Sequence, residues 1–218
     1  MKTIFAVFIF FIFFISYKNS FASHGDPVNG FYVNKNGDTV YGSFPKKIPR
    51  GTAVFKFQPT GGSAIMNISF DTCIAVSCGE VLYKKWYGTR SMAYIDKFTL
   101  DIVNLDNYET GIITLERVFQ GESLGLYYFR DVRDHFFIEK DGYIDELAIS
   151  YRYTTDSEKL QYPINPPTYF INPVYRAQLI SLMGDKLSKK KKLLVESCEF
   201  NLLSLTRLLK KIDPAPKK

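Results

Sequence analysis

Two tight-turn dipeptides, each set between apolar segments, constrain the fold of this chain most strongly. They are Asn36-Gly37 and Asp141-Gly142. Both favour the positive φ angles of a type I′ turn, which joins two antiparallel strands by a short connection. The pattern predicts two β-hairpins, formed by segments 31–35 with 39–44 and 135–140 with 143–149.

Further segments rich in β-branched and aromatic residues predict more strands. These segments are 54–57, 64–70, 74–86, 112–119 and 124–130. Short links join the last four strands of the region, so an antiparallel meander is expected there. We therefore predict an α+β chain whose domain 23–162 is a mainly antiparallel β sandwich or partly open barrel.

Two to three short C-terminal α-helices are predicted to follow this β domain. Prolines crowd segment 163–172, which we interpret as a connector without regular structure. The helical segment 173–213 then opens at Asn172-Pro173, and Gly184 ends its first helix. Asp185 or Ser188 is expected to cap a second helix and Asn201 a third, and a basic tail, 214–218, closes the chain.

The first 22 residues, Met1 to Ala22, have the pattern of a secretory signal peptide. Lys2 precedes an unbroken apolar run from Ile4 to Ile15, and small residues stand at 20 and 22. A membrane anchor is the alternative, but twelve residues span only about 18 Å of helix. We expect export to the periplasm or cell exterior, with no transmembrane span after cleavage.

Positive charge gathers at the C-terminal end of the chain. Ten lysines or arginines stand against four acids from Asp185 onward. The densest run, Lys189, Lys190, Lys191 and Lys192, is a candidate contact for anionic lipid. A solvated helix face is the alternative, and no nucleic-acid partner is expected for an exported protein.

The three cysteines, Cys73, Cys78 and Cys198, give an odd count, so at least one thiol has no intramolecular disulfide partner. Cys73 and Cys78 would be about 16 Å apart in one extended strand, too far for a disulfide. They would pair only across a turn. Three small buried side chains are the alternative that we favour.

The sequence contains no recognisable catalytic or metal-binding motif. His24 stands near the expected new N-terminus, so His135 is the remaining candidate for histidine chemistry. We interpret it as a half-exposed strand residue whose replacement changes stability modestly. No metal or cofactor is expected, but carboxylates brought together by the fold would suit a glycoside hydrolase.

Aromatic residues concentrate in the predicted meander. Because side chains alternate along a strand, rings are expected on both faces of the sheet. One face then suits a binding surface for sugars or peptides, and packing under the helices is the alternative. The candidate binding residues are Tyr127, Tyr128, Phe129, His135 and Phe137.

Several short motifs follow one another in a recognisable order. They are Asn36-Gly37-Asp38-Thr39-Val40-Tyr41-Gly42, then Leu126-Tyr127-Tyr128 with the stretch 135–140, then helical stretches 175–183 and 200–209. This order resembles the N-G-D-T-x-x-G opening, the L-Y-Y…H-F-F-I-E-K hairpin and the closing helices of an uncharacterised family of exported Bacteroidota proteins. The resemblance implies no activity. Related domains sometimes precede an outer-membrane β-barrel, and because this chain ends at Lys218 we expect no barrel here.

The sequence thus predicts an exported, non-catalytic β-rich module that binds an unknown protein or envelope component. One alternative is a periplasmic or secreted hydrolase that uses carboxylates. Another is a protein whose basic C-terminal helices act at anionic lipid. The oligomeric state remains open.

Overall fold

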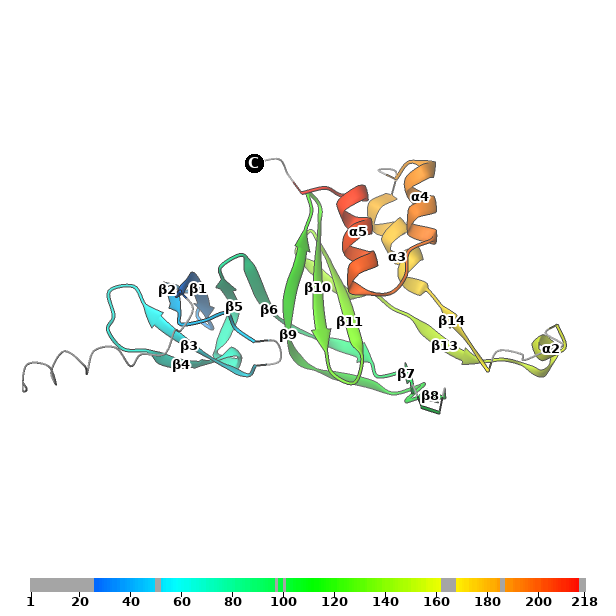
Figure 1. Cartoon of the computed structure of the whole chain (residues 1–218), viewed down its shortest axis with the longest axis horizontal. Helices are drawn as coiled ribbons and strands as arrows, with labels where there is room; N and C mark the ends of the chain where they lie inside the picture. The colour runs from blue at the N-terminus through cyan, green and yellow to red at the C-terminus, as the bar shows by residue number, and fades with distance from the viewer. Residues whose placement is uncertain are drawn as a thin grey trace, which may run out of the picture.

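The computed structural model describes residues 26–49, 52–96, 98–99, 101–161, 168–184 and 187–215. The predicted signal peptide, His24 and segment 163–167 of the predicted connector lie outside the described residues. Within them, the chain is an α+β protein made mainly of antiparallel strands, with short helices toward its C-terminus (Figure 1).

Ten strands form one antiparallel sheet in the order β12-β11-β10-β9-β6-β5-β1-β2-β3-β4, and β7–β8 and β13–β14 form two separate pairs. The predicted meander corresponds to β9 to β12. The strands are β1 (Val28–Asn34), β2 (Thr39–Phe44), β3 (Val54–Pro59), β4 (Met66–Ser69), β5 (Cys73–Cys78), β6 (Val81–Ser91), β7 (Tyr94–Ile95), β8 (Ile102–Val103), β9 (Tyr108–Gln120), β10 (Leu124–Arg130), β11 (Asp134–Lys140), β12 (Tyr143–Glu146), β13 (Ser150–Tyr153) and β14 (Tyr169–Asn172).

Only one of the two predicted turns has the expected geometry. Asp141 and Gly142 both have positive φ, 51° and 85°, as a type I′ turn requires. In the first hairpin only Gly37 does, so the type I′ prediction for Asn36-Gly37 is wrong. The side-chain oxygen of Asn34 accepts the backbone N–H groups of Asn36 and Asp38, each at 2.9 Å, and this holds a longer loop.

The predicted strand 74–86 is two strands, β5 and β6, joined by a turn at Gly79, whose φ is 63°. Cys73 and Cys78 lie at opposite ends of β5. They and Cys198 are free thiols with buried side chains.

The sheet curls until β12 approaches β6, although the two are not neighbours in the strand order. The indole Nε1 of Trp86 on β6 donates to the carbonyl oxygen of Ile144 on β12 at 2.9 Å. The same ring packs edge-on against Phe137, with centroids 4.7 Å apart. Side-chain bonds, rather than a backbone ladder, thus bridge the two strands and give a partly open barrel.

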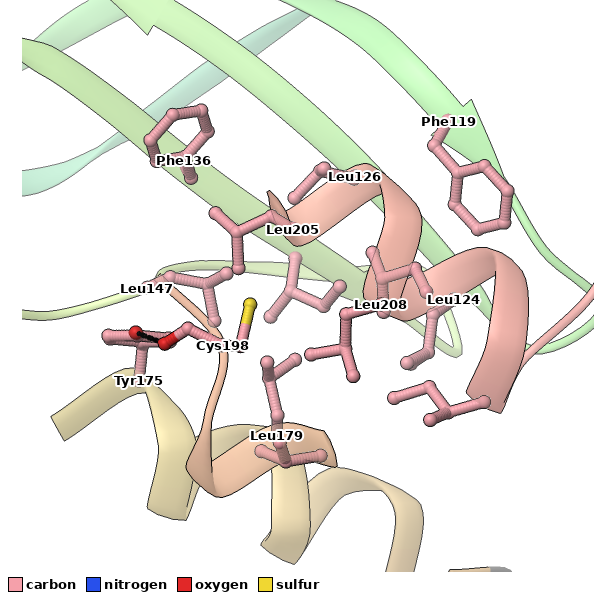
Figure 2. Close-up of a cluster of buried hydrophobic side chains, with 14 of the residues drawn as sticks. Phe119, Leu124, Leu126, Phe136, Leu147, Tyr175, Leu179, Cys198, Leu205 and Leu208 are labelled. Carbon is pink, nitrogen blue, oxygen red and sulfur yellow. Dashed lines mark hydrogen bonds between the residues drawn. The ribbon is translucent and has the colours of Figure 1, made fainter. Parts of the chain in front are cut away.

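Three apolar cores support this curled sheet within the described residues, and the smallest lies inside the curl around Ile113, Leu115, Tyr127 and Phe137. The strands of the N-terminal part enclose rings that meet edge to face, such as Phe44 and Phe57 at 5.1 Å. A larger core lies between β10–β11 and the C-terminal helices (Figure 2). There Leu126 and Phe136 of the sheet meet Leu179, Leu205 and other helix side chains.

The helices are α2 (Asp156–Lys159), α3 (Val174–Met183), α4 (Lys189–Glu196) and α5 (Leu202–Ile212), after a 3₁₀ turn η2 (Phe70–Thr72) near the N-terminal core. Ser188 and Asn201 cap α4 and α5 as predicted, each accepting a backbone N–H. Helix α3 begins one residue later than predicted, with Pro173 at its N-cap and no side-chain cap bond.

Residue Asp213 fastens the end of α5 to the turn between β9 and β10. Its buried carboxylate accepts the backbone N–H groups of Ser123 and Leu124, the latter at 2.7 Å. Any side chain at Gly121 would collide with this carboxylate, so glycine is required there.

The end of the predicted connector is not irregular, because Tyr169–Asn172 forms strand β14 and pairs with β13. The prolines at 163, 166 and 167 precede this strand. None of the four residues of β14 is a proline, so each keeps its backbone N–H as a hydrogen-bond donor. The β structure therefore extends beyond the predicted boundary at 162.

Candidate functional site

A group of charged side chains gathers around the buried residues Arg90 and His135 on the inner side of the β6–β9 ribbon. Arg90 on β6 contacts Glu109 at 2.7 Å and Asp131 at 3.1 Å. His135 on β11 lies between two carboxylates, with Nε2 2.9 Å from Asp131 and Nδ1 2.7 Å from Glu146. We call this group the inner charge cluster: Arg90, Glu109, Asp131, Arg133, His135 and Glu146.

The charge of Asp131 depends on its neighbours in this cluster. Both nitrogens of His135 lie within hydrogen-bond distance of a carboxylate oxygen. Burial alone would raise the pKa of the Asp131 carboxyl, but electrostatic interaction with His135 and hydrogen bonds from Arg133, His135 and Arg90 lower it below its ordinary value. These contacts therefore favour the ionised form of Asp131.

Each carboxylate oxygen of the two central acids, Asp131 and Glu146, accepts at least one hydrogen bond. Both oxygens of Asp131 accept hydrogen bonds, and Glu146 accepts from His135 and Arg133 with Oε1 and from the backbone of Ser91 with Oε2. Both nitrogens of His135 are also within hydrogen-bond distance of these acids. The contacts hold the β10–β11 turn and β12 against the end of β6. This arrangement does not suit moving a proton.

His135 was predicted to be half exposed, and that prediction is wrong: its exposed fraction is 0%. The strand pattern placed it correctly at the start of β11. It did not show that Asp131 and Glu146 from neighbouring elements cover both edges of the ring.

A second ion pair lies on the same inner side. Lys84 on β6 contacts Glu139 on β11 at 2.5 Å, and the hydroxyl of Tyr127 donates to the same carboxylate at 2.6 Å. Burial alone would raise the pKa of Glu139, but Lys84 and Tyr127 lower it by hydrogen bonding and charge. Burial and this contact with Glu139 also raise the pKa of Tyr127.

The outward face of the ribbon is different in chemistry. Strands β6 and β9 pair with Tyr87 opposite Ile112, Thr89 opposite Thr110 and Ser91 opposite Tyr108. Because side chains alternate, these positions share one face. Tyr87, Tyr108 and Ile112 are 71%, 64% and 59% exposed. We call Tyr87, Thr89, Tyr108, Thr110 and Ile112 the outer strip.

A cleft opens beside the outer strip where β9 and β10 separate. The strands pair from Gln120 to Glu116, and the last pair is Glu116 with Tyr128. Beyond it β9 continues alongside β6 alone. The space between the diverging strands, which we call the fork cleft, has a volume of about 320 Å³ and is lined by Phe70, Tyr83, Ile112, Thr114, Tyr128 and Phe129, with Asp71, Glu116 and Arg130 at its wall.

The predicted binding residues divide between these places. Tyr127 and Phe137 are fully buried in the core with Ile113 and Leu115, so they are packed rather than exposed. The alternation of side chains along β10 and β11 places Tyr127 and Phe137 on the inner side of the curled sheet, where Trp86 packs in the same core. Tyr128 and Phe129 line the fork cleft, although Tyr128 is 93% buried.

The predicted lysines lie on α4 and are not equivalent. Lys189, Lys190 and Lys192 are exposed, whereas Lys191 is half-buried and donates to the carbonyl oxygen of Ile212 at 3.0 Å. Lys191 therefore stabilises the end of α5. The exposed three remain available for an anionic surface.

The sequence interpretation missed the outer strip. A signal was present in the alternation of side chains along both strands. On β6, Tyr87 and Thr89 alternate with Trp86, Gly88 and Arg90. On β9, Tyr108, Thr110 and Ile112 alternate with Glu109, Gly111 and Ile113. The strand predicted for this region began at residue 112, so the part of the alternation that precedes it was not used.

No protein-family model, curated protein or solved structure matches the chain. Its resemblance to the exported Bacteroidota family therefore stays a prediction. Within the described ranges, no helix is long and apolar enough to cross a membrane, and those same residues include no group of three or more side chains placed to hold a metal ion.

Proposed function

We propose that this chain is an exported, non-catalytic β-rich module that binds a protein or another envelope component through the outer strip and the fork cleft. One observation carries the proposal. Tyr87, Tyr108 and Ile112 are exposed together on one face of a strand pair, and such an apolar group on a surface is typical of interaction sites.

The opposite face of the same ribbon supports this proposal. It is fixed by Trp86, Arg90 and the backbone of Ser91, so the outer strip is held in place before any ligand arrives. A surface that needs no ordering on binding loses less entropy. The engagement of both His135 nitrogens supports a non-catalytic role.

Binding to isolated cell-envelope fractions tests this function. The full chain is expected to sediment with these fractions, and the Tyr87→Ser/Ile112→Ser variant is expected to remain in the supernatant. Tyr143→Ser is the matched control, because Tyr143 is 79% exposed on β12, a different strand. Absence of sedimentation for the unmodified chain, or equal sedimentation of all three proteins, contradicts the proposal.

Export itself rests on the predicted signal peptide at Met1–Ala22. Expression of the full chain in its native host, followed by cell fractionation and N-terminal sequencing, is expected to give a mature protein that starts at Ser23. A cytoplasmic chain that retains Met1–Ala22 contradicts this part of the proposal.

A second candidate function is action of the basic helices at anionic lipid. A hollow of about 400 Å³ between α4 and α5 is lined by Arg207 and Lys211 together with Ser197, Ser204 and one acid, Glu199. The two cations outnumber the acid, which suits a phosphate headgroup. Binding to phosphatidylglycerol vesicles, but not to phosphatidylcholine vesicles, that is lost in Arg207→Gln/Lys211→Gln would support it.

The hydrolase alternative rests on Asp71 and Glu116 in the wall of the fork cleft. Turnover of a glycoside panel by the unmodified chain, lost in Glu116→Gln and in Asp71→Asn, would favour this alternative over a binding module.

A further inference from the structure

The outer strip combines exposed rings and hydroxyl groups on one strand pair. Tyr87 stands opposite Ile112 near one end, and Tyr108 stands opposite Ser91 at the other. Ser91 is four positions beyond Tyr87, so the two rings are anchored about 13 Å apart along the strands. Between them, the hydroxyls of Thr89 and Thr110 lie 2.7 Å from each other.

These threonine hydroxyls keep unused bonding capacity. Each hydroxyl has one donor and two acceptor positions. Their mutual bond uses one donor and one acceptor, so one donor and three acceptor positions remain for a ligand. Both side chains are exposed, so these positions are open on the surface between the rings.

The outer strip contains no charged side chain. Arg90 and Glu109 alternate with the strip residues and contact each other at 2.7 Å. Lys85, the next residue before Tyr87 on the outward face, donates to the carbonyl oxygen of Asp71 at 2.7 Å. A ligand on the outer strip therefore meets apolar rings, a branched aliphatic side chain and hydroxyls. This chemistry matches a neutral ligand that offers C–H faces and many hydroxyl groups, and it does not match a phosphate or an acidic peptide.

We propose that the outer strip binds a neutral oligosaccharide chain laid along the β6–β9 ribbon. Its sugar rings pack on Tyr87 and Tyr108, and its hydroxyls bond Thr89 and Thr110. Because Ile112 also lines the fork cleft, the chain can extend from the strip into that cleft. The inference rests on the proposed binding function and adds the chemical class of the envelope ligand.

An extended apolar peptide is the competing occupant. It would use Ile112 and both tyrosine rings, but it would not need the side-chain hydroxyls of Thr89 and Thr110. Replacing these two threonines by valine keeps the shape and removes only the hydroxyls. The Thr89→Val/Thr110→Val variant therefore separates an oligosaccharide from a peptide.

The test uses the full chain with immobilised chitin, cellulose and mannan as probes, followed by titration with soluble oligosaccharides of the polymer that binds. The unmodified chain is expected to bind at least one polymer. Tyr87→Ser, Tyr108→Ser and Thr89→Val/Thr110→Val are each expected to weaken binding about tenfold, which corresponds to about 1.4 kcal/mol. Tyr87→Phe keeps the ring and most of the affinity, and Tyr143→Ser is the unaffected control.

Three results would overturn the inference. The first is no binding to any polymer, and the second is binding by the tyrosine and threonine variants that equals that of the unmodified chain. The third is envelope binding that depends on Tyr87 but not on the threonine hydroxyls, which identifies an apolar peptide. If the chain sediments with envelope fractions but binds no polymer, the binding function stands and the ligand class is wrong. Unchanged melting temperatures show that each variant is folded.

Discussion

The two faces of the β6–β9 ribbon reverse the usual distribution of side chains. On the inner face, Arg90 is 95% buried and bonds two carboxylates. On the outer face, Tyr87 and Ile112 are mostly exposed. Charged residues ordinarily lie outside and large apolar residues inside, so both faces depart from the expected pattern.

The difference indicates separate roles for the two faces. Buried charges are tolerated when each is paired and hydrogen-bonded. Each charged side chain of the inner charge cluster has such partners, from β6, β9, β11, β12 or the β10–β11 turn, although Nη1 of Arg90 and Nη1 of Arg133 are buried without a hydrogen-bond partner. These bonds fix the position of the ribbon. The outer strip contributes little to the fold, so its composition is free to serve a ligand.

The inner face is expected to give the largest loss of stability. Replacing His135 by Ala removes the ring that bridges Asp131 and Glu146, and it leaves two partly buried carboxylates without this hydrogen-bond partner. Breaking such a buried contact costs about 3–5 kcal/mol. Urea unfolding of His135→Ala measures the loss, with Tyr143→Ser as control. A loss below about 1 kcal/mol would mean that the cluster is not important for stability.

Low pH is expected to give the second-largest loss of stability, because it protonates carboxylates on the inner face. The pKa values of Asp131 and Glu139 are lowered in the folded protein, so their ionised forms contribute stability above about pH 4, where unfolded carboxyls ionise. This stability is lost as the pH falls through the lowered folded values.

Melting temperatures measured between pH 7 and pH 2 test this expectation. Glu139→Gln has lost its carboxyl and should show a flatter decline below pH 4 than the unmodified chain. Parallel curves for the two proteins would show that Glu139 has no part in the acid sensitivity.

A smaller effect is expected where β6 meets β12. Trp86→Phe keeps an aromatic ring against Phe137 but removes the donor to the carbonyl oxygen of Ile144. Loss of one such bond costs about 1 kcal/mol. Hydrogen exchange of β12 amides should become faster, while α5 amides should be unchanged. Unaltered exchange in β12 would show that this bond does not hold the barrel closed.

The outer face should give the smallest effect on stability. Tyr87→Ser and Thr89→Val/Thr110→Val change exposed side chains and are expected to alter unfolding free energy by no more than about 0.5 kcal/mol. Urea unfolding of these variants and of His135→Ala under the same conditions compares the two faces directly. A loss of 2 kcal/mol in either variant would show that the outer strip is structural.

Most strands and helix ends were predictable because their signals are local. Asp141-Gly142 has the dihedral angles that its turn demands, and Asn201 and Ser188 cap their helices with their own side chains. The turn at Asn36-Gly37 was mistaken because the side chain of Asn34, outside the dipeptide, selects a longer loop.

The candidate site was less predictable because its contacts join distant parts of the chain. Tyr128 and Phe129 were identified from composition and do line the fork cleft, but Tyr127 and Phe137 lie on the side that the curled sheet buries. Whether an alternating strand face is exposed depends on which segment folds over it.

The sequence by itself determined the strand-rich composition, the alternation along β6 and β9, and the caps of α4 and α5, since all of these follow from backbone preferences and near neighbours. Only the tertiary structure decided which face of the ribbon is buried. Arg90 and Asp131 are 41 positions apart, and Trp86 and Ile144 are 58 apart. Such pairs meet only when the whole sheet has curled, because no local rule fixes its curvature.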